Sequence, residues 1–303
     1  MSPLSFQENI ILPALQLIKH DAKVKRFYFF PGLVSIVFMS LLLVYQSIYT
    51  YVIILWKKEE ALEVILNFLH SQYVTEVIVS VVIFIVFYFI SAPIFESSLI
   101  RYIDEKVHGN KVSISDSLGF GVFRFYPMFE HNNIFSMFKF MSLINAFLFA
   151  VRFFGVEYMS YMITVFFIAF IFSIVINTLV SYAKFEIVLQ NKTVFQAIGV
   201  SSKIALLNLK TTLRLYVMMF ILNIRVIFNF IIFLAFPLLV VGTVSFITSS
   251  VFLTIAMVVI WALFIIFIGF IGYMTAVLEV FTNAAWYFAY KEWREKLEQA
   301  KVE

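Results

Sequence analysis

Long apolar runs with few charges constrain this chain more than any other feature of its sequence. Each run is close to or above the roughly 20 residues that a helix needs to cross a bilayer. They lie at 31–56, 74–95, 134–154, 159–182, 215–246 and 251–278. Of all residues, 63% are hydrophobic and only 13% are charged, which excludes a water-soluble domain, where about a quarter are charged. We therefore expect an all-α polytopic membrane helix bundle of about six transmembrane helices.

The loops between these runs differ in their content of Lys and Arg. One side of the predicted membrane would carry only Lys57, Lys58 and Arg152. The other side would carry most of the basic residues of the N-terminal segment, of the loops after 95 and 182, and of the C-terminal tail. Because cytoplasmic loops are enriched in Lys and Arg, we expect both termini to be cytoplasmic. The richness in Phe and Ile suggests an AT-rich genome, and we expect a multi-pass protein of a bacterial inner (plasma) membrane.

The chain is expected to divide into three parts. Residues 1–30 form an N-terminal cytoplasmic segment in which Ser5 and Glu8 fit a capping box, so that an amphipathic helix begins near Phe6. Residues 31–290 form the membrane domain, and residues 291–303 form a charged cytoplasmic tail. The N-terminal helix is expected to lie on the membrane surface. The alternative is a positively charged flank that only fixes topology.

A second amphipathic segment follows the run 159–182. On a continuous helical wheel, four basic residues fall within one narrow stripe: Lys192, Lys203, Lys210 and Arg214. A basic stripe on a cytoplasmic in-plane helix is typical of binding to anionic lipid headgroups. The lipid bilayer, and anionic lipids in particular, are therefore the expected partners. The alternative is that these residues fix topology without lipid specificity.

A short pattern occurs twice in the predicted cytoplasmic loops. Residues 105–111 and 186–192 share Glu-x-Val-x-x-Asn-Lys, and each lies between an outgoing and a returning run. In addition, three even-numbered runs end near an apolar-Glu pair, which places Glu96, Glu186 and Glu279 at the predicted cytoplasmic mouth. These patterns suggest three related helical hairpins, an organisation that is common in transporters and also in proteins that are only duplicated.

The segment Phe195-Gln-Ala-Ile-x-x-Ser201, set between a short Asn-Lys turn and a returning run, carries a family resemblance. Residues 95–290 resemble uncharacterised bacterial inner-membrane families. Among these is the membrane domain that is sometimes fused to glycerophosphodiester phosphodiesterases. The resemblance implies a helical membrane domain, and it carries no catalytic residue to this chain because the fused catalytic domain has no counterpart here.

Arg225 is the most unusual single residue in the apolar runs. It lies about ten residues into the run 215–246, roughly 15 Å along a helix. A charge at that depth is costly and indicates either function or a buried structural partner. Asn145 is expected at a similar depth, and Asn229 one turn beyond Arg225 on the same face. These three residues form a candidate intramembrane polar site.

Catalytic signatures are missing from the sequence. The chain has no cysteine, and His20, His70, His108 and His131 are not spaced as metal ligands. Nucleophile-elbow, phosphate-binding and dinucleotide-binding motifs are absent. We therefore expect no catalytic site, no metal and no cofactor, and the chain is not expected to be an enzyme. Nucleic-acid binding is not expected, because the basic residues follow topology and do not form one soluble surface.

Two functions fit these features. The first is a membrane-embedded accessory or scaffold protein of the cell envelope, for which a membrane-protein partner is a candidate. It is favoured by the in-plane helices, the short outer loops and the missing catalytic chemistry. The alternative is a transporter or permease-like subunit for a small polar or anionic solute, with Arg225 in the pathway. A lipid-modifying enzyme is the least favoured, because no set of catalytic residues supports it.

Overall fold

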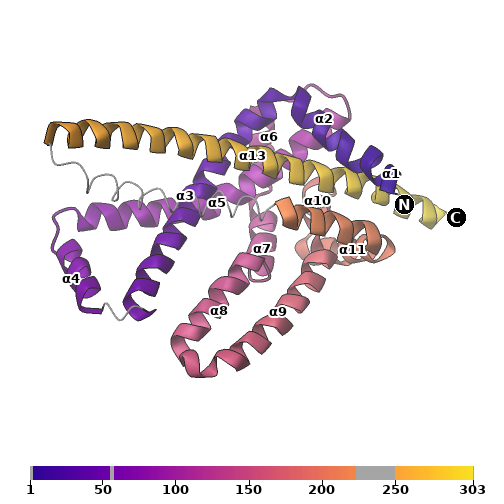
Figure 1. The fold of residues 1–303 in the computed structure, drawn as a ribbon. Coiled ribbons are helices and arrows are strands. Elements are labelled where there is room, and N and C mark those ends of the chain that lie inside the picture. Colours follow the sequence, from indigo (N-terminus) through magenta and orange to yellow (C-terminus); the bar gives the residue numbers. More distant parts are fainter. Residues whose placement is uncertain (1–2, 55–57, 223–249, 303) are drawn as a thin grey trace. The chain divides into compact units, whose positions relative to one another are not determined.

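The structure is a computed structural model that describes residues 3–54, 58–222 and 250–302. Over this part of the chain the regular elements are helices and none is a strand (Figure 1). Two of the candidate intramembrane residues, Arg225 and Asn229, lie outside the described residues, as does most of the predicted run 215–246. The all-helical class expected from the sequence is confirmed for the described part.

The helices group into two compact units. Unit 1 comprises the described residues within 1–24, 93–228 and 278–303, and unit 2 comprises those within 25–92 and 229–277. The N-terminal and middle elements are α1 (Pro3–Phe6), η1 (Gln7–Ile11), α2 (Leu12–His20), α3 (Ala22–Ile54), α4 (Lys58–Leu69), α5 (Val74–Val107), α6 (Ile114–Phe123) and α7 (Phe125–Ser136). The later elements are α8 (Phe140–Phe154), η2 (Val156–Tyr158), α9 (Met159–Val180), α10 (Ala183–Leu189), α11 (Val194–Leu207), a helix over Leu209–Leu222, and α13 (Ser250–Val302).

Three helical stretches are long and apolar enough to cross a membrane. They are Val74–Val107, Val156–Leu189 and Ile265–Gln299, and a fourth crossing results if the bent pair Val194–Leu207 and Leu209–Leu222 counts as one span. Large apolar side chains on these helices, such as Ile83, Val165 and Ile266, are exposed. Exposed apolar surface of this extent indicates contact with lipid, so the chain is a membrane-embedded protein.

The described residues therefore supply three or four of the six predicted crossings. The predicted run 134–154 is divided between the end of α7 and α8, and α8 has only 15 residues. At 1.5 Å per residue such a helix is about 22 Å long, shorter than the hydrocarbon core of a typical bilayer.

Unit 2 is held by close approach of its helices. A Cβ atom built on Gly32 of α3 would lie 2.8 Å from the carbonyl oxygen of Gly272 of α13. A Cβ atom on Gly272 would lie 2.6 Å from Leu33 Cδ2. Phe38 of α3 stacks on Tyr88 of α5 with ring centroids 4.0 Å apart. Small residues that let two backbones approach are typical of helix packing in membranes.

In unit 1 the two copies of Glu-x-Val-x-x-Asn-Lys have similar but not identical local structures, because the left-handed residue is the fifth of the motif in one copy and the sixth in the other. Each lies where a helix, α5 or α10, ends, and each contains a residue with left-handed backbone, Gly109 at φ 77° and Asn191 at φ 57°. Each is followed by a capped helix. Ser113 accepts a hydrogen bond from the backbone N–H of Ser115 before α6, and Thr193 forms a capping box with Gln196 before α11. Left-handed turns and Ser/Thr caps define these helix boundaries.

Helix α11 packs on the ends of α9 and α10. The Ser201 hydroxyl is fully buried, donates to the carbonyl oxygen of Leu179 at 2.6 Å and accepts from the backbone N–H of Tyr182 at 3.0 Å. These bonds satisfy backbone groups at the break between α9 and α10, where the helical ladder is interrupted. The last residue of the 195–201 segment thus positions α11.

The prediction of one continuous amphipathic helix through residues 192–214 was wrong, because the helix is interrupted. Helix α11 ends at Leu207, and the helix Leu209–Leu222 is bent from it by 100°. Asn208 causes the break: its side chain donates to the carbonyl oxygen of Ile204, and its own carbonyl accepts from the N–H groups of Thr211 and Thr212. Lys203 and Lys210 therefore lie on different helices and do not share one stripe.

Candidate functional site: buried contacts between helix ends

Residues of α5, α7, α10 and α13 meet in unit 1 around a partly buried ion pair. The Lys184 ammonium of α10 donates to the Glu96 carboxylate of α5 at 3.0 Å and to the Asn283 side-chain oxygen of α13 at 2.6 Å. Asn132 of α7 donates to the other Glu96 oxygen at 3.1 Å. We call these four residues the polar junction. Because every member bonds to another helix, the junction holds four helices together.

His131 lies beside the polar junction on α7. Its Nδ1 atom is 3.3 Å from the Asn132 side-chain oxygen, whereas its Nε2 atom is buried and has no partner among the described residues. Burial lowers the pKa of the imidazole below its usual value, although the nearby Glu96 carboxylate acts in the opposite direction. The ring is therefore neutral at pH 7, with Nδ1 carrying the proton if it donates to Asn132.

A second buried contact is centred on Glu186, whose side chain is completely buried. One carboxylate oxygen accepts from the Lys192 ammonium at 2.5 Å. The other accepts from the Tyr290 hydroxyl at 3.0 Å and lies 3.4 Å from Arg294 Nη1. A buried carboxylate is tolerated when charged and polar donors surround it, and here two of the three come from α13.

The break between α2 and α3 is held by Asp21. Its carboxylate accepts from the backbone N–H groups of Lys23 and Val24 and from the Tyr102 hydroxyl at 2.8 Å, and it lies 3.4 Å from the Lys106 ammonium. Burial acts to raise the pKa of the Asp21 carboxyl, but the hydrogen bonds and Lys106 together hold it below its usual value. Asp21 therefore caps α3 and joins it to the end of α5.

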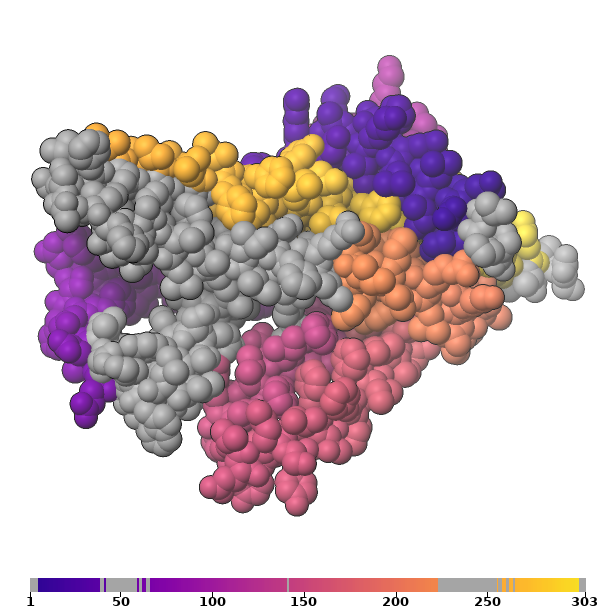
Figure 2. All heavy atoms as spheres, in the orientation of Figure 1, coloured from indigo at the N-terminus to yellow at the C-terminus, as the bar shows by residue number. Residues whose placement is uncertain are grey.

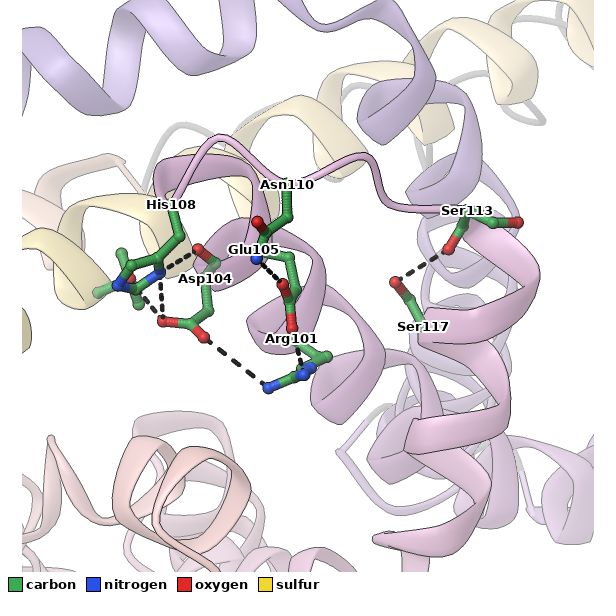
Figure 3. Close-up of polar contacts among 8 residues, drawn as sticks. Arg101, Asp104, Glu105, His108, Asn110, Ser113 and Ser117 are labelled. Carbon is green, nitrogen blue, oxygen red and sulfur yellow. Dashed lines mark hydrogen bonds and ion pairs between the residues drawn. The ribbon is translucent and has the colours of Figure 1, made fainter.

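Figure 3 shows the polar residues at the end of α5 and the start of α6. Arg101 forms an ion pair with Glu105, one helical turn along, and its other terminal nitrogen is 3.9 Å from Asp104. His108 lies close to the carboxylate and the carbonyl group of Asp104. Asn110 donates to Glu105 at 2.5 Å. These contacts stay within one helix end and its turn, so they stabilise local structure.

The three acids predicted at the cytoplasmic mouth differ in their contacts. Glu96 and Glu186 lie in the two contacts described above, on α5 and α10. The Glu279 side chain is exposed and makes no hydrogen bond with the described residues, and its backbone carbonyl accepts from the Asn283 side chain at 2.9 Å. Asn145, the described member of the intramembrane set, lies partly buried on α8.

The residues of the predicted lipid stripe also differ in environment. The Lys192 ammonium is occupied by Glu186, as described above. Lys203 and Lys210 are exposed. Arg214 lies over the ring of Phe6, with its guanidinium carbon 5.2 Å from the ring centroid. Of these four residues, only Lys203 and Lys210 are therefore accessible enough to bind lipid headgroups.

Sequence reasoning missed the partners of these acids. Lys184 and Arg294 count in the sequence only toward the excess of Lys and Arg in the predicted cytoplasmic segments, and Asn283 and Tyr290 have no predicted role. A signal for Lys184 was present, since it directly precedes the Phe185-Glu186 pair at the end of an apolar run. The partners on α13 lie about a hundred residues away in sequence, so no local pattern identifies them.

Comparison with known proteins does not assign the chain to a family: no family model, no curated protein and no solved structure matches it. Within the described residues, no group of three or more His, Cys, Asp or Glu side chains is placed to hold a metal ion. Over the described residues, the fold and the buried contacts define the class as an all-helical membrane-embedded protein in which ion pairs join helices.

Proposed function

We propose that this chain is a membrane-embedded accessory or scaffold protein of the cell envelope. The observation that carries the proposal is the Glu186 carboxylate, which is completely buried and is bonded or ion-paired to Lys192, Tyr290 and Arg294. A charge with all its partners inside the protein holds helices in one arrangement. A fixed arrangement of helices is what a scaffold needs in order to present a surface to other molecules.

The polar junction supports the same conclusion. Groups in a solute pathway must exchange partners with the solute, whereas the Lys184 ammonium is held by two acceptors on different helices. Breaking a buried ion pair by removing one member is strongly unfavourable, by about 3–5 kcal/mol. The transporter alternative depended on Arg225, which lies outside the described residues, and no contact of the described residues favours it.

The placement of the termini supports one further part of the proposal. Residues near both ends belong to unit 1, and both are tied to the end of α5: Asp21 to Tyr102 and Lys106, and Tyr287 to Asp104. We propose that both termini lie on one side of the membrane, the cytoplasmic side of a bacterial inner membrane. The excess of Lys and Arg in these segments is the reason for choosing that side.

The proposal is tested by extracting the protein directly from its own membrane into polymer-bounded nanodiscs. Mass spectrometry of the intact particles then reports any protein that accompanies it at fixed stoichiometry. A scaffold is expected to retain such a partner, and an unrelated polytopic protein extracted in the same way serves as the control. Recovery of the chain without a partner at fixed stoichiometry would overturn the proposal.

A further inference from the structure

The cations at the buried contacts of unit 1 have acidic partners: Lys106 with Asp21, Lys184 with Glu96, and both Lys192 and Arg294 with Glu186. Arg124 differs from them, because it has no acidic partner among the described residues. Its guanidinium makes no hydrogen bond and no ion pair with the described residues, and its Nε atom is buried without an acceptor. An arginine without an acidic partner keeps its terminal N–H groups free to bind an anion.

Arg124 stands at the corner between two helices. It is the single residue between α6 and α7, with φ −92° and ψ 9°. Its guanidinium carbon lies 5.7 Å from the ring centroid of Phe120 and 5.5 Å from that of Phe123. Two rings thus position the guanidinium by cation–π contacts, which leave its planar donor edge available.

The surface around Arg124 is apolar. Val122, Phe123 and Tyr126 are 59%, 78% and 72% exposed. Arg101 lies on the same Phe120 ring, at 5.2 Å, but its charge is compensated by Glu105. The corner therefore combines one uncompensated cation with exposed aromatic side chains, which is typical of groups that lie in the headgroup region of a membrane.

The chain path is consistent with this location. Helix α7 leads into the apolar helix α8, whose Phe149 and Phe153 are 64% and 74% exposed. In Figure 2 the side chains of α8 and α9 (pink) project from the rest of unit 1. The corner is separated from α8 by the 12 residues of α7, about 18 Å of helix, and we place it at the surface of the bilayer that α8 and α9 contact.

We propose that the corner around Arg124 binds the phosphate of an anionic phospholipid. The guanidinium donates to phosphate oxygens, to which its planar fork is matched. Phe123 and Tyr126 lie beside the glycerol and upper acyl region. Lys203 and Lys210 are less suited, because an exposed ammonium is strongly hydrated and neither is positioned by aromatic rings. The inference does not depend on the scaffold function.

The test uses the full-length protein in nanodiscs of phosphatidylcholine that contain a minor fraction of phosphatidylglycerol. Native mass spectrometry measures the ratio of the two lipids that remain bound. The wild type is expected to enrich phosphatidylglycerol, and Arg124→Gln is expected to reduce the enrichment about fivefold, as loss of one basic contact implies. Lys296→Gln is the matched control, since Lys296 is also basic but pairs with Glu292 on the tail of α13; it is expected to leave the enrichment unchanged.

Two further variants decide the matter if Arg124→Gln does not fold. Arg124→Lys keeps the charge, loses the planar fork and is expected to retain part of the enrichment. Phe123→Ser changes a side chain that is mostly exposed and is expected to lower the enrichment with the fold intact. Unchanged enrichment in folded Arg124→Gln or Phe123→Ser, an equal loss in Lys296→Gln, or displacement of the lipid by inorganic phosphate would each overturn the proposal.

Discussion

Tyr287 of α13 donates its hydroxyl to the Asp104 carboxylate of α5 at 2.7 Å, across 183 residues of sequence. Two further tyrosines make the same kind of bond in unit 1: Tyr290 to Glu186 and Tyr102 to Asp21. Tyrosine suits these positions because its ring packs in an apolar interior while its hydroxyl reaches a polar group. Two of these bonds join α13 to α5 and to α10. The third joins Asp21, at the break between α2 and α3, to α5.

Removal of a tyrosine hydroxyl tests how much these bonds stabilise unit 1. Tyr287→Phe and Tyr290→Phe are each expected to lower the free energy of unfolding by about 1–3 kcal/mol, the value for a hydrogen bond to a charged group. Thermal unfolding in detergent, followed by circular dichroism, measures the change. Tyr161→Phe on α9 is the control, because that side chain is 74% exposed. Equal midpoints for all three variants and the wild type would contradict the prediction.

The contribution of the buried carboxylate is tested at Glu186. Glu186→Ala leaves Lys192 without its anion and Arg294 with only the exposed Glu298, and it is expected to cost about 3–5 kcal/mol. Glu105→Ala removes the acid of a more exposed pair with Arg101 and is expected to cost about 1 kcal/mol or less. The same unfolding measurement compares the two. If both variants unfold at the same temperature, the special role assigned to Glu186 is wrong.

Packing of α6 against α5 depends on the absence of a side chain at Gly121. A Cβ atom there would overlap Ser98 Oγ and the carbonyl oxygen of Ile94. Gly121→Ala is therefore expected to cost about 1–3 kcal/mol through overpacking. Gly119→Ala on the same helix meets nothing within 4 Å and is expected to be neutral or to stabilise by up to about 1 kcal/mol. A midpoint for Gly121→Ala as high as that for Gly119→Ala would contradict this packing.

The length of the apolar runs was sufficient to predict the class of fold. Hydrophobicity over 74–95 predicted a crossing helix, and α5 contains it, because an apolar helix needs no distant partner to be stable in lipid. The same signal could not show that α5 continues to Val107 or α13 to Val302. These extensions are more polar, and their buried faces are set by contacts with other helices, such as Asn283 with Lys184.

The candidate site was predictable only in part. The apolar-Glu pattern found Glu96 and Glu186 because both lie at the end of an apolar run. It did not distinguish them from Glu279, which has the same local pattern and an exposed side chain. The continuous wheel through Lys203 and Lys210 failed for a related reason: periodicity does not register the hydrogen bonds by which Asn208 ends one helix and begins the next.

The side on which each terminus lies can be measured with single cysteines, because the natural chain contains none. Lys19→Cys and Lys296→Cys are expected to react with a membrane-impermeant maleimide from the same side of sealed vesicles. Glu157→Cys, in η2 between α8 and α9, is expected to react from the opposite side. Labelling of the two terminal positions from opposite sides would contradict both the proposed topology and the contacts that join Asp21 and Tyr287 to α5.

The neutral state of His131 makes stability depend on pH. Burial lowers the pKa of the folded imidazole below the ordinary value of 6.5, so the unfolded chain binds the proton first as the pH falls. The contribution of neutral His131 to the free energy of unfolding is therefore fully present above pH 6.5. It declines as the pH falls from 6.5 toward the pKa of the folded imidazole. Glu96, Lys184 and Lys139 are the charged groups that act on the ring.

The measurement is the unfolding midpoint at pH 7 and pH 5. The wild type is expected to unfold at a lower temperature at pH 5 than at pH 7. His131→Gln is expected to show a smaller difference between the two midpoints, because the group that takes up the proton is gone. The low pKa of Asp21 affects stability only below about pH 3.8 and so does not interfere in this range. His70→Gln, at an exposed position, is expected to keep the wild-type pH dependence. If His131→Gln loses as much stability between pH 7 and pH 5 as the wild type does, the buried neutral imidazole is not the group responsible.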